Sequence, residues 1–200
     1  MTLRRVGAVL IALCLGACSM ATKEPAPEAS MKPRDKKLLA SAPYKKILPP
    51  DMYQRSIVDY TGRERPGTIV VDTDRKFLYY VEDGGKAIRY GVTVGEEGLA
   101  FKGEAKVGRK AEWPTWTPTP EIKQRLTGIP NFVGPGPHNP MGARALYLYQ
   151  GNKDTLFRIH GTNQPEYIGQ AISSGCIRML NEDVIDLYNR VPQGTEVVVL

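Results

Sequence analysis

A run of predicted β-strands that begins at Thr68 limits the folds available to this chain. Thr68–Asp72, Lys76–Val81 and Ala87–Val94 are rich in the β-branched and aromatic residues that favour strands. The segments between them, Thr73–Arg75 and Glu82–Gly85, contain the Asp and Gly residues that form tight turns. Consecutive strands are therefore expected to pair as a meander.

Further strands and a short helix follow the meander. Strands are predicted over Ala143–Gln150, Thr155–His160 and Glu196–Leu200. A helix is predicted to begin at Thr119 as N-cap, with Pro120 in its first position. The chain is thus expected to be mainly β, with one or two short helices.

A second helix is predicted near the C-terminus. Asn181 is expected to cap its start, where Glu182 also suits the helix dipole. Apolar residues recur there at i, i+3, i+4 and i+7, namely Val184, Leu187, Tyr188 and Val191. This stripe is expected to pack on the core.

The first residues have the pattern of an export signal. Met1–Arg5 supplies positive charge, and Val6–Leu15 is an apolar run too short to span a bilayer as a stable helix. Leu15-Gly16-Ala17-Cys18 resembles a bacterial lipobox, in which cleavage precedes a cysteine that is then lipidated. We therefore expect residues 1–17 to be a lipoprotein signal peptide and Cys18 to carry a membrane anchor.

Cys176 is then the one cysteine left with a free thiol, because the other two lie in the export signal. A lone cysteine often serves as a small buried hydrophobe. Here Gly175 and Ser174 give the thiol an open, polar approach, which favours a reactive residue. His160, one of the two histidines, ends a predicted strand that holds it rigidly. These two residues are candidates for a cysteine nucleophile and its base, which meet in space rather than along the chain.

The segments that contain these two residues are similar to the signature of the L,D-transpeptidase catalytic domain, the YkuD family. The family pattern is a His-Gly-Thr segment followed by Ser-His-Gly-Cys-Ile/Val-Arg/Asn. This chain has His160-Gly161-Thr162-Asn163 and then Ser173-Ser174-Gly175-Cys176-Ile177-Arg178. Asn139-Pro140-Met141-Gly142 is similar to the family's Asn-Pro-Leu-Gly segment, and the likeness covers roughly Gly67 to Leu200. One position departs, because Ser174 stands where the family usually has histidine.

The resemblance implies a role for each matching residue. Cys176 is the expected nucleophile and His160 the general base and acid, with the Gly161 backbone orienting the imidazole. The Gly175 N–H is expected to donate to the oxyanion. Substrate contacts are expected from a further set: Ser173, Ser174, Arg178, Thr162, Asn163 and Tyr167. For the arginine of this set the alternative is that its guanidinium ties down the loop by hydrogen bonds.

The family likeness also implies a β-sandwich-like catalytic fold and an activity on peptidoglycan. A thioester on Cys176 would carry the acyl group of a tetrapeptide stem, cut between the L-centre of a diamino acid and a terminal D-Ala. The acceptor would be an amine on another stem or on an envelope protein. Two alternatives stay open: an envelope cysteine hydrolase of the L,D-carboxypeptidase type, and a lipoprotein that binds peptidoglycan without catalysis. No cofactor or metal is expected, because two histidines and one free thiol fit no zinc spacing.

Charge and composition divide the chain into a tether and one folded domain. The net charge is +6, and the basic excess of the processed chain lies before Pro66, whereas fifteen basic residues balance fifteen acidic ones over Pro66–Leu200. A nucleic-acid-binding domain would carry a basic surface itself, so no nucleic-acid partner is expected. We predict a flexible tether over residues 18–45, an N-terminal arm over 46–66 and a catalytic domain over 67–200. The lipid anchor would place this domain in the bacterial cell envelope, facing the periplasm, with the outer membrane as the expected membrane.

Two other features have competing interpretations. Trp113 and Trp116 either line a groove for a peptide or glycan or anchor the core. His138, in the loop that follows Gly134, is the weaker candidate for the base because no predicted strand holds it.

Overall fold

The computed structural model describes residues 22–23, 31–96, 99 and 101–200. The predicted signal peptide, the Cys18 anchor and part of the predicted tether lie outside these residues. Within the described ranges, no helix has both the length and the apolar character needed to cross a membrane.

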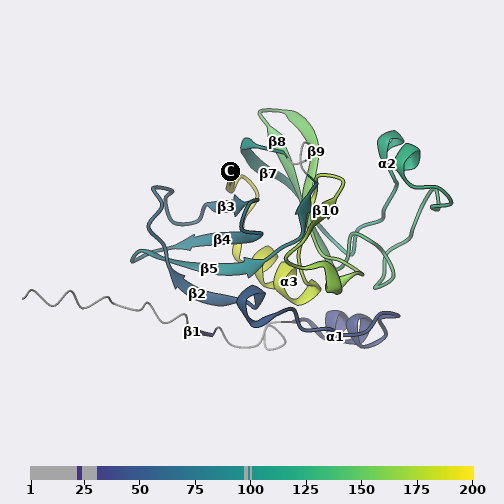
Figure 1. The fold of residues 1–200 in the computed structure, drawn as a ribbon, viewed down its shortest axis with the longest axis horizontal. Coiled ribbons are helices and arrows are strands. Elements are labelled where there is room, and N and C mark those ends of the chain that lie inside the picture. The colour runs from purple at the N-terminus through teal and green to yellow at the C-terminus, as the bar shows by residue number, and fades with distance from the viewer. Residues whose placement is uncertain (1–21, 24–30, 97–98, 100) are drawn as a thin grey trace, which may run out of the picture.

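The described residues form short helices and many strands (Figure 1). The helices are α1 (Pro33–Ala40), α2 (Pro120–Arg125) and α3 (Asn181–Arg190), with single 3₁₀ turns at Asp51–Tyr53 and Pro165–Tyr167. The strands are β1 (Thr22–Lys23), β2 (Ser56–Asp59), β3 (Ile69–Asp72), β4 (Phe77–Glu82), β5 (Lys86–Gly91), β6 (Val94–Gly95), β7 (Gly103–Glu112), β8 (Arg144–Gln150), β9 (Lys153–His160), β10 (Ala171–Ser173), β11 (Ile177–Arg178) and β12 (Glu196–Val199).

One mixed sheet contains most of these strands. Its order is β1-β2-β5-β4-β3-β12-β7-β8-β9-β11, and β10 pairs separately with β6. The predicted meander is confirmed, because β3, β4 and β5 pair antiparallel in sequence order. β12 pairs parallel with β3, where Val198 lies opposite Val70, and antiparallel with β7. The C-terminal strand thus joins the meander to the part of the sheet that ends in β9 and β11.

One large hydrophobic cluster joins the two parts of the sheet. Figure 1 shows β3, β4 and β5 running across the view while β7, β8 and β9 stand upright, with α3 near their junction. Both parts and α3 contribute fully buried side chains, among them Ile69, Leu78, Leu146, Ile159, Val184 and Leu187. Each such side chain contributes about 1.5–3 kcal/mol through burial. The expected mainly β, sandwich-like class is confirmed.

The starts of α2 and α3 differ in how well the sequence predicted them. α2 begins as expected, since the Ile122 N–H donates to Thr119 Oγ1 at 3.4 Å. The apolar stripe of α3 is also confirmed, but the predicted cap is wrong. Leu180 is the N-cap residue and makes no side-chain cap bond. The Asn181 side chain is buried and forms hydrogen bonds to other segments.

The segment before the meander differs from the predicted tether. Pro33–Ala40 is helical, so the helices exceed the one or two expected. Asp35 is 1 % exposed and forms a two-point ion pair with Arg144, with Oδ2–Nη2 and Oδ1–Nη1 distances of 2.7 and 3.1 Å. Trp113 Nε1 also donates to Asp35 at 2.8 Å. Polar contacts therefore hold this segment, although its low apolar content suggested a free spacer.

The predicted arm packs on the domain as well. The ring of Tyr53 lies 5.3 Å from the ring of Phe77, measured between centroids, and Arg55 pairs with Asp186 at 2.9 Å. Strand β2 adds to the sheet beside β5.

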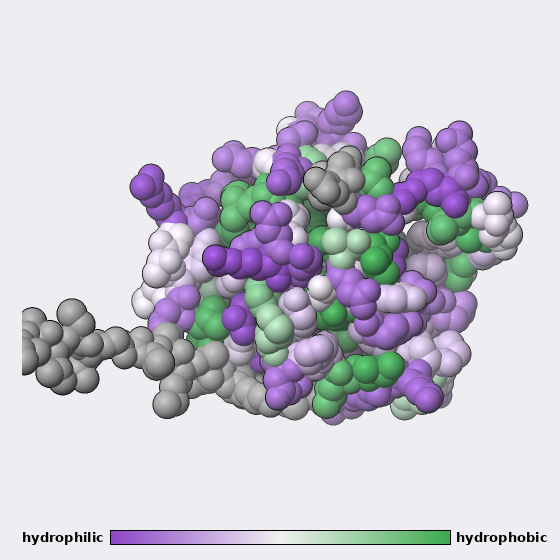
Figure 2. All heavy atoms as spheres, in the orientation of Figure 1, coloured by the Kyte–Doolittle hydropathy of each residue, from purple (hydrophilic) through white to green (hydrophobic). Residues whose placement is uncertain are grey.

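Figure 2 shows that hydrophilic side chains cover much of one face, with hydrophobic side chains in separate patches between them.

Candidate active site

Two neighbouring strands bring the predicted nucleophile and base to one part of the sheet. β9 ends at His160, and Cys176 directly precedes β11. β11 pairs parallel with β9, so that Ile177 lies opposite Ile159 and Arg178 lies opposite His160. The two motif segments, separated in sequence, are therefore adjacent in the sheet.

The His160 imidazole is buried and held by its own loop. Its exposed fraction is 5 %, and its Nδ1 lies 2.6 Å from the Gly161 carbonyl oxygen. Because a carbonyl only accepts hydrogen bonds, this contact assigns the proton to Nδ1 and leaves Nε2 as the basic nitrogen. Burial, and secondly the charge of Arg178, lower the pKa of His160 to about 3. The imidazole is therefore neutral at pH 7 and able to accept a proton.

Cys176 is half-buried, and it is the free cysteine of the described residues. Its Sγ lies 4.0 Å from the carbonyl oxygen of Leu156. Burial raises the pKa of the thiol, against the opposing effects of Arg158, through its backbone N–H and its charge, and of Arg178. The thiol is therefore protonated at neutral pH, and its attack on a substrate requires proton transfer to a base.

The turn before the thiol accepts only glycine without rearrangement. Gly175 has a φ of +114°, and a Cβ there would lie 2.6 Å from both the Leu99 carbonyl oxygen and Phe157 Cε1. Ser173 braces the same turn, since its hydroxyl donates to the Cys176 carbonyl at 2.6 Å and accepts from the Gly175 N–H at 3.2 Å. The Gly175 N–H, expected to be an oxyanion donor, is thus already used within the protein.

A family model of the L,D-transpeptidase catalytic domain, YkuD, matches residues 66–199, which contain both segments of this site. The chain belongs to this family.

Curated YkuD-family relatives from Escherichia coli strain K12 agree with this assignment. The protein named probable L,D-transpeptidase ErfK/SrfK is 37 % identical over 142 residues, which cover 68 % of this chain and 44 % of that protein. The protein named probable L,D-transpeptidase YbiS is 36 % identical over 137 residues, which cover 66 % of this chain and 43 % of that protein. The match to this chain thus spans less than half the length of these relatives.

Solved structures show the same fold. A structure from Brucella melitensis, titled a probable carnitine operon oxidoreductase, is 52 % identical and covers 76 % of this chain and 96 % of that chain, with a TM-score of 0.51. The catalytic domain of the E. faecium L,D-transpeptidase is 23 % identical and covers 70 % of this chain and all of that chain (100 %), with a TM-score of 0.51. The second likeness concerns the fold alone. The name oxidoreductase is that of the Brucella protein, whereas the YkuD match rests on the residues of this chain.

Two motif residues expected to contact substrate are turned into the protein instead. Thr162 and Ser173 are 2 % and 1 % exposed. The hydroxyl of Thr162 accepts from the Gln164 N–H at 3.0 Å, and the hydroxyl of Ser173 braces the cysteine turn. In both cases burial and internal hydrogen bonds replace the predicted substrate contact with a structural one.

The other motif residues lie nearer the surface. Ser174 is exposed, while Arg178 and Tyr167 are half-buried. Arg178 Nη1 donates to the side-chain oxygen of Gln164 at 3.3 Å, which is the loop-tying contact considered as its alternative role. Asn163 donates to the carbonyl of His138 at 2.9 Å and so joins two loops.

The structure distinguishes between the competing interpretations of the two tryptophans and of His138. Trp113 is 2 % exposed and anchors the core, and Trp116 packs against the buried cluster that contains Met141 and Tyr147. His138 is exposed in its loop, as expected for a residue that no strand holds.

Asn181 is the site residue that the sequence interpretation missed. Its Oδ1 accepts from the Ala143 N–H at 2.8 Å, and its Nδ2 donates to the Thr162 carbonyl at 2.7 Å. It therefore links the loop before β8 to the loop after His160. Its place shortly after the cysteine motif was the available signal, but that signal was interpreted as helix capping.

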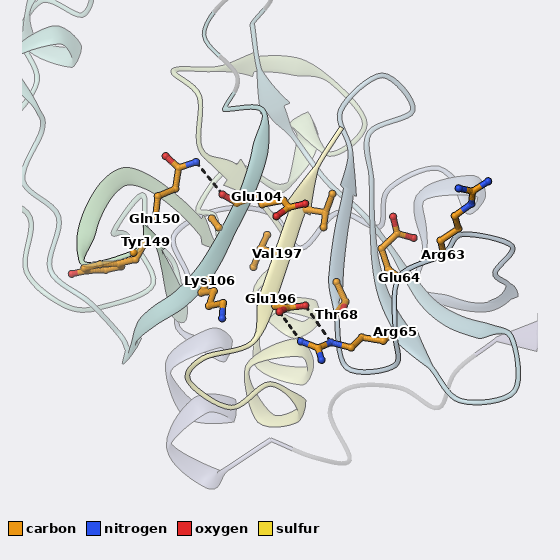
Figure 3. A pocket seen from close by; sticks show the side chains of 13 residues that line it. Arg63, Glu64, Arg65, Thr68, Glu104, Lys106, Tyr149, Gln150, Glu196 and Val197 are labelled. Atoms are coloured by element: carbon orange, nitrogen blue, oxygen red, sulfur yellow. Dashed lines mark hydrogen bonds and ion pairs between the residues drawn. The ribbon is translucent and has the colours of Figure 1, made fainter.

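A hollow of about 910 Å³ lies elsewhere, over β7 and β12 (Figure 3). Arg65 Nη2 and Glu196 Oε1 pair within it at 2.6 Å. Its basic side chains are matched in number by acidic ones, and none of its lining residues belongs to the 160–178 segment. Among the described residues, no group of three or more His, Cys, Asp or Glu side chains is placed to hold a metal ion.

Proposed function

We propose that this chain is a peptidoglycan L,D-transpeptidase in which Cys176 is the nucleophile and His160 the general base and acid. The observation that carries the proposal is the parallel register of β9 and β11, which brings the two motif segments together. The protonation states support it, because a protonated thiol and a neutral imidazole are the reactants for base-assisted attack.

The reaction begins as Nε2 of His160 takes the thiol proton and Sγ attacks the amide carbonyl of the donor stem. The positive charges of Arg158 and Arg178 favour the thiolate as it forms. The backbone N–H of Cys176 is the candidate donor to the oxyanion, since that of Gly175 is already bonded. One such donor contributes about 100-fold or more to the rate.

Collapse of the tetrahedral intermediate breaks the C–N bond and leaves a thioester on Cys176. Protonated His160 gives its proton to the departing amine, so the imidazole is neutral again. An acceptor amine then attacks the thioester carbonyl, its proton passes to His160, and the S–C bond breaks. The proton returns to Sγ, and a new amide bond has formed with no net gain or loss of protons.

The proposed donor is a tetrapeptide stem cut before its terminal D-Ala, and the proposed acceptor is an amine of a second stem or of an envelope protein. Family membership supports this substrate class. The half-buried guanidinium of Arg178 lies beside the site and is suited to a substrate carboxylate.

We further propose that Cys18 is lipidated and anchors the chain in the bacterial envelope, with the domain facing the periplasm. The lipobox-like Leu15-Gly16-Ala17-Cys18 sequence supports this. Replacing Cys18 by Ser should release the protein from the membrane fraction or leave the signal uncleaved. A variant that is processed and sediments with membranes like the wild type would contradict the anchor.

The activity is tested by incubating the purified full-length protein with muropeptides and resolving the products by mass. A transpeptidase gives a cross-linked dimer, a hydrolase gives a shortened monomer, and a binding lipoprotein leaves the muropeptides unchanged. Cys176→Ala is the control and should abolish turnover while leaving the fold intact. A shortened monomer as the main product in the presence of abundant acceptor would replace the proposal by the hydrolase.

A further inference from the structure

The catalytic site is in contact with a segment that precedes the family match. The match begins at residue 66, yet Tyr44 from the preceding segment reaches the Asn181 side chain. Asn181 Nδ2 donates to the Tyr44 hydroxyl oxygen at 2.7 Å. The same segment contributes Asp35 to the buried ion pair with Arg144. Residues outside the matched domain therefore contact Arg144 and Asn181. Both of these residues form hydrogen bonds to the loop that follows His160.

The Asn181 amide has all its principal hydrogen-bonding groups in use. One N–H donates to the Thr162 carbonyl, the other donates to Tyr44, and the oxygen accepts from the Ala143 N–H. The side chain is 3 % exposed. It is also tightly enclosed, because a Cβ on either Gly142 or Gly161 would lie 2.2 Å from its Oδ1. The amide thus has one well-defined orientation.

That orientation determines the direction of the carbonyl that holds the imidazole. The Gly161 N–H donates to the Arg144 carbonyl at 3.0 Å, and the Thr162 carbonyl accepts from Asn181 at 2.7 Å. The Gly161 carbonyl lies between these two fixed points and accepts from His160 Nδ1 at 2.6 Å. A shift of Asn181 would therefore move the group that sets the tautomer and tilt of the ring.

We propose that Tyr44 is a positioning residue for His160, acting through Asn181. This inference rests on the proposed role of His160 as the base. Loss of the Tyr44 hydroxyl leaves one buried Asn181 N–H without its partner, which weakens the restraint on the orientation of the amide. The ion pair of Asp35 with Arg144 supports the same arrangement, because Arg144 also donates to the Ala143 carbonyl at 2.8 Å. The segment thus restrains Arg144, whose carbonyl accepts from the Gly161 N–H, and Asn181, which donates to the Thr162 carbonyl.

The test compares Tyr44→Phe with Tyr60→Phe in the full-length protein. Tyr60 also precedes the family match and donates a hydrogen bond, to Glu64 at 2.6 Å, so its variant is a matched control for loss of a hydroxyl. Two readouts are used: the rate of Cys176 alkylation by iodoacetamide, followed on the peptide that contains this cysteine, and the ring ¹H and ¹⁵N NMR signals of His160. Neither readout needs a peptidoglycan substrate. The outcome of this test is therefore independent of the muropeptide test of the proposed activity.

Tyr44→Phe should slow alkylation about 5- to 100-fold, a part of the roughly 100- to 10,000-fold that a positioned general base contributes, and should shift or broaden the Nδ1–H signal of His160. Tyr60→Phe should leave both within twofold of the wild type. A double-mutant cycle adds a second check, since Tyr44→Phe should have almost no further effect in an Asn181→Ala background, where the partner of the hydroxyl is absent. Wild-type alkylation and unchanged ring signals in Tyr44→Phe would overturn the inference. Full additivity of the two substitutions would also overturn it, because Tyr44 would then act by another route.

Discussion

Arg178 in β11 is the register partner of His160 in β9, and its charge acts on both titrating groups of the site. It lowers the pKa of His160, after the larger effect of burial, and it opposes the rise in the pKa of Cys176 that burial causes. One guanidinium therefore favours both the neutral imidazole and the thiolate.

Replacing Arg178 by Gln should raise the pKa of Cys176 further above its ordinary value. The alkaline midpoint of Cys176 alkylation by iodoacetamide should then move to higher pH. Below the midpoint the rate should fall several-fold, because one pKa unit changes the thiolate concentration about tenfold. Arg75→Gln is the control, since Arg75 is an exposed arginine of the β3–β4 turn that pairs with Asp72. An unchanged midpoint in Arg178→Gln would mean that the charge does not reach the thiol.

The two histidines should differ sharply in their effect on acylation. His160→Ala should slow acylation of Cys176 by a carbapenem about 100- to 10,000-fold, as loss of a general base usually does. His138→Ala should change the rate little, because that side chain is exposed in a loop. Intact mass under single-turnover conditions measures the step. Equal losses of rate in the two variants would contradict the assignment of His160 as the base.

The candidate catalytic pair could be found in the sequence because its signal is local. Cys176 and His160 each lie in a short segment whose neighbours, Gly175 and Gly161, are also diagnostic. The supporting contacts were not predictable in this way. Tyr44 meets Asn181 across 137 positions of the chain, and no local pattern in either segment encodes that contact.

The same distinction between local and distant signals applies to the strands. The meander was predictable from its β-branched runs, but β7 was missed because charged residues alternate with small ones along Gly103–Glu112. Ala105 and Val107 supply its buried side, and Gly108 leaves room for the Tyr149 ring, which a Cβ would meet at 2.4 Å. Pairing with β12 and β8 stabilises this strand where its own residues do not. Likewise α1 depends on a partner distant in sequence, Arg144.

Gly175→Ala should disable the site with a measurable loss of stability. The positive φ and the 2.6 Å approaches to Leu99 and Phe157 require the turn to move. A shift of about 1 Å at a reacting atom costs about 100-fold in rate, and the strain should cost about 1–3 kcal/mol of unfolding free energy. Gly84→Ala is the matched control, since Gly84 has a φ of +72° but nothing within 4 Å of the added Cβ. It should lose some stability while alkylating Cys176 at the wild-type rate.

Acid should destabilise the protein through His160. The folded-state pKa is lowered from 6.5 to about 3, so below pH 6.5 the unfolded state binds a proton that the folded state does not. The free energy of unfolding should therefore fall as the pH decreases from about 6.5 toward 3, by about 2 kcal/mol at pH 5. Urea unfolding of wild type and His160→Gln between pH 7 and pH 5 isolates this contribution. His138→Gln should keep the wild-type slope, and a His160→Gln slope equal to that of the wild type would contradict the buried neutral imidazole.

Asp35→Ala should destabilise the whole domain, although Asp35 precedes the family match. The substitution leaves the fully buried Arg144 guanidinium without its two-point partner, and the nearest remaining carboxylate, Glu112, lies 3.8 Å away. Removing one member of a buried ion pair costs about 3–5 kcal/mol, and Glu112 should keep the loss near the lower end. Asp51→Ala is the control, because Asp51 forms an exposed hydrogen bond with Gln54 and should change stability little. Urea unfolding measures both variants. If the two unfold alike, α1 is not an integral part of the domain, and residues 18–45 act as the tether that their composition suggests.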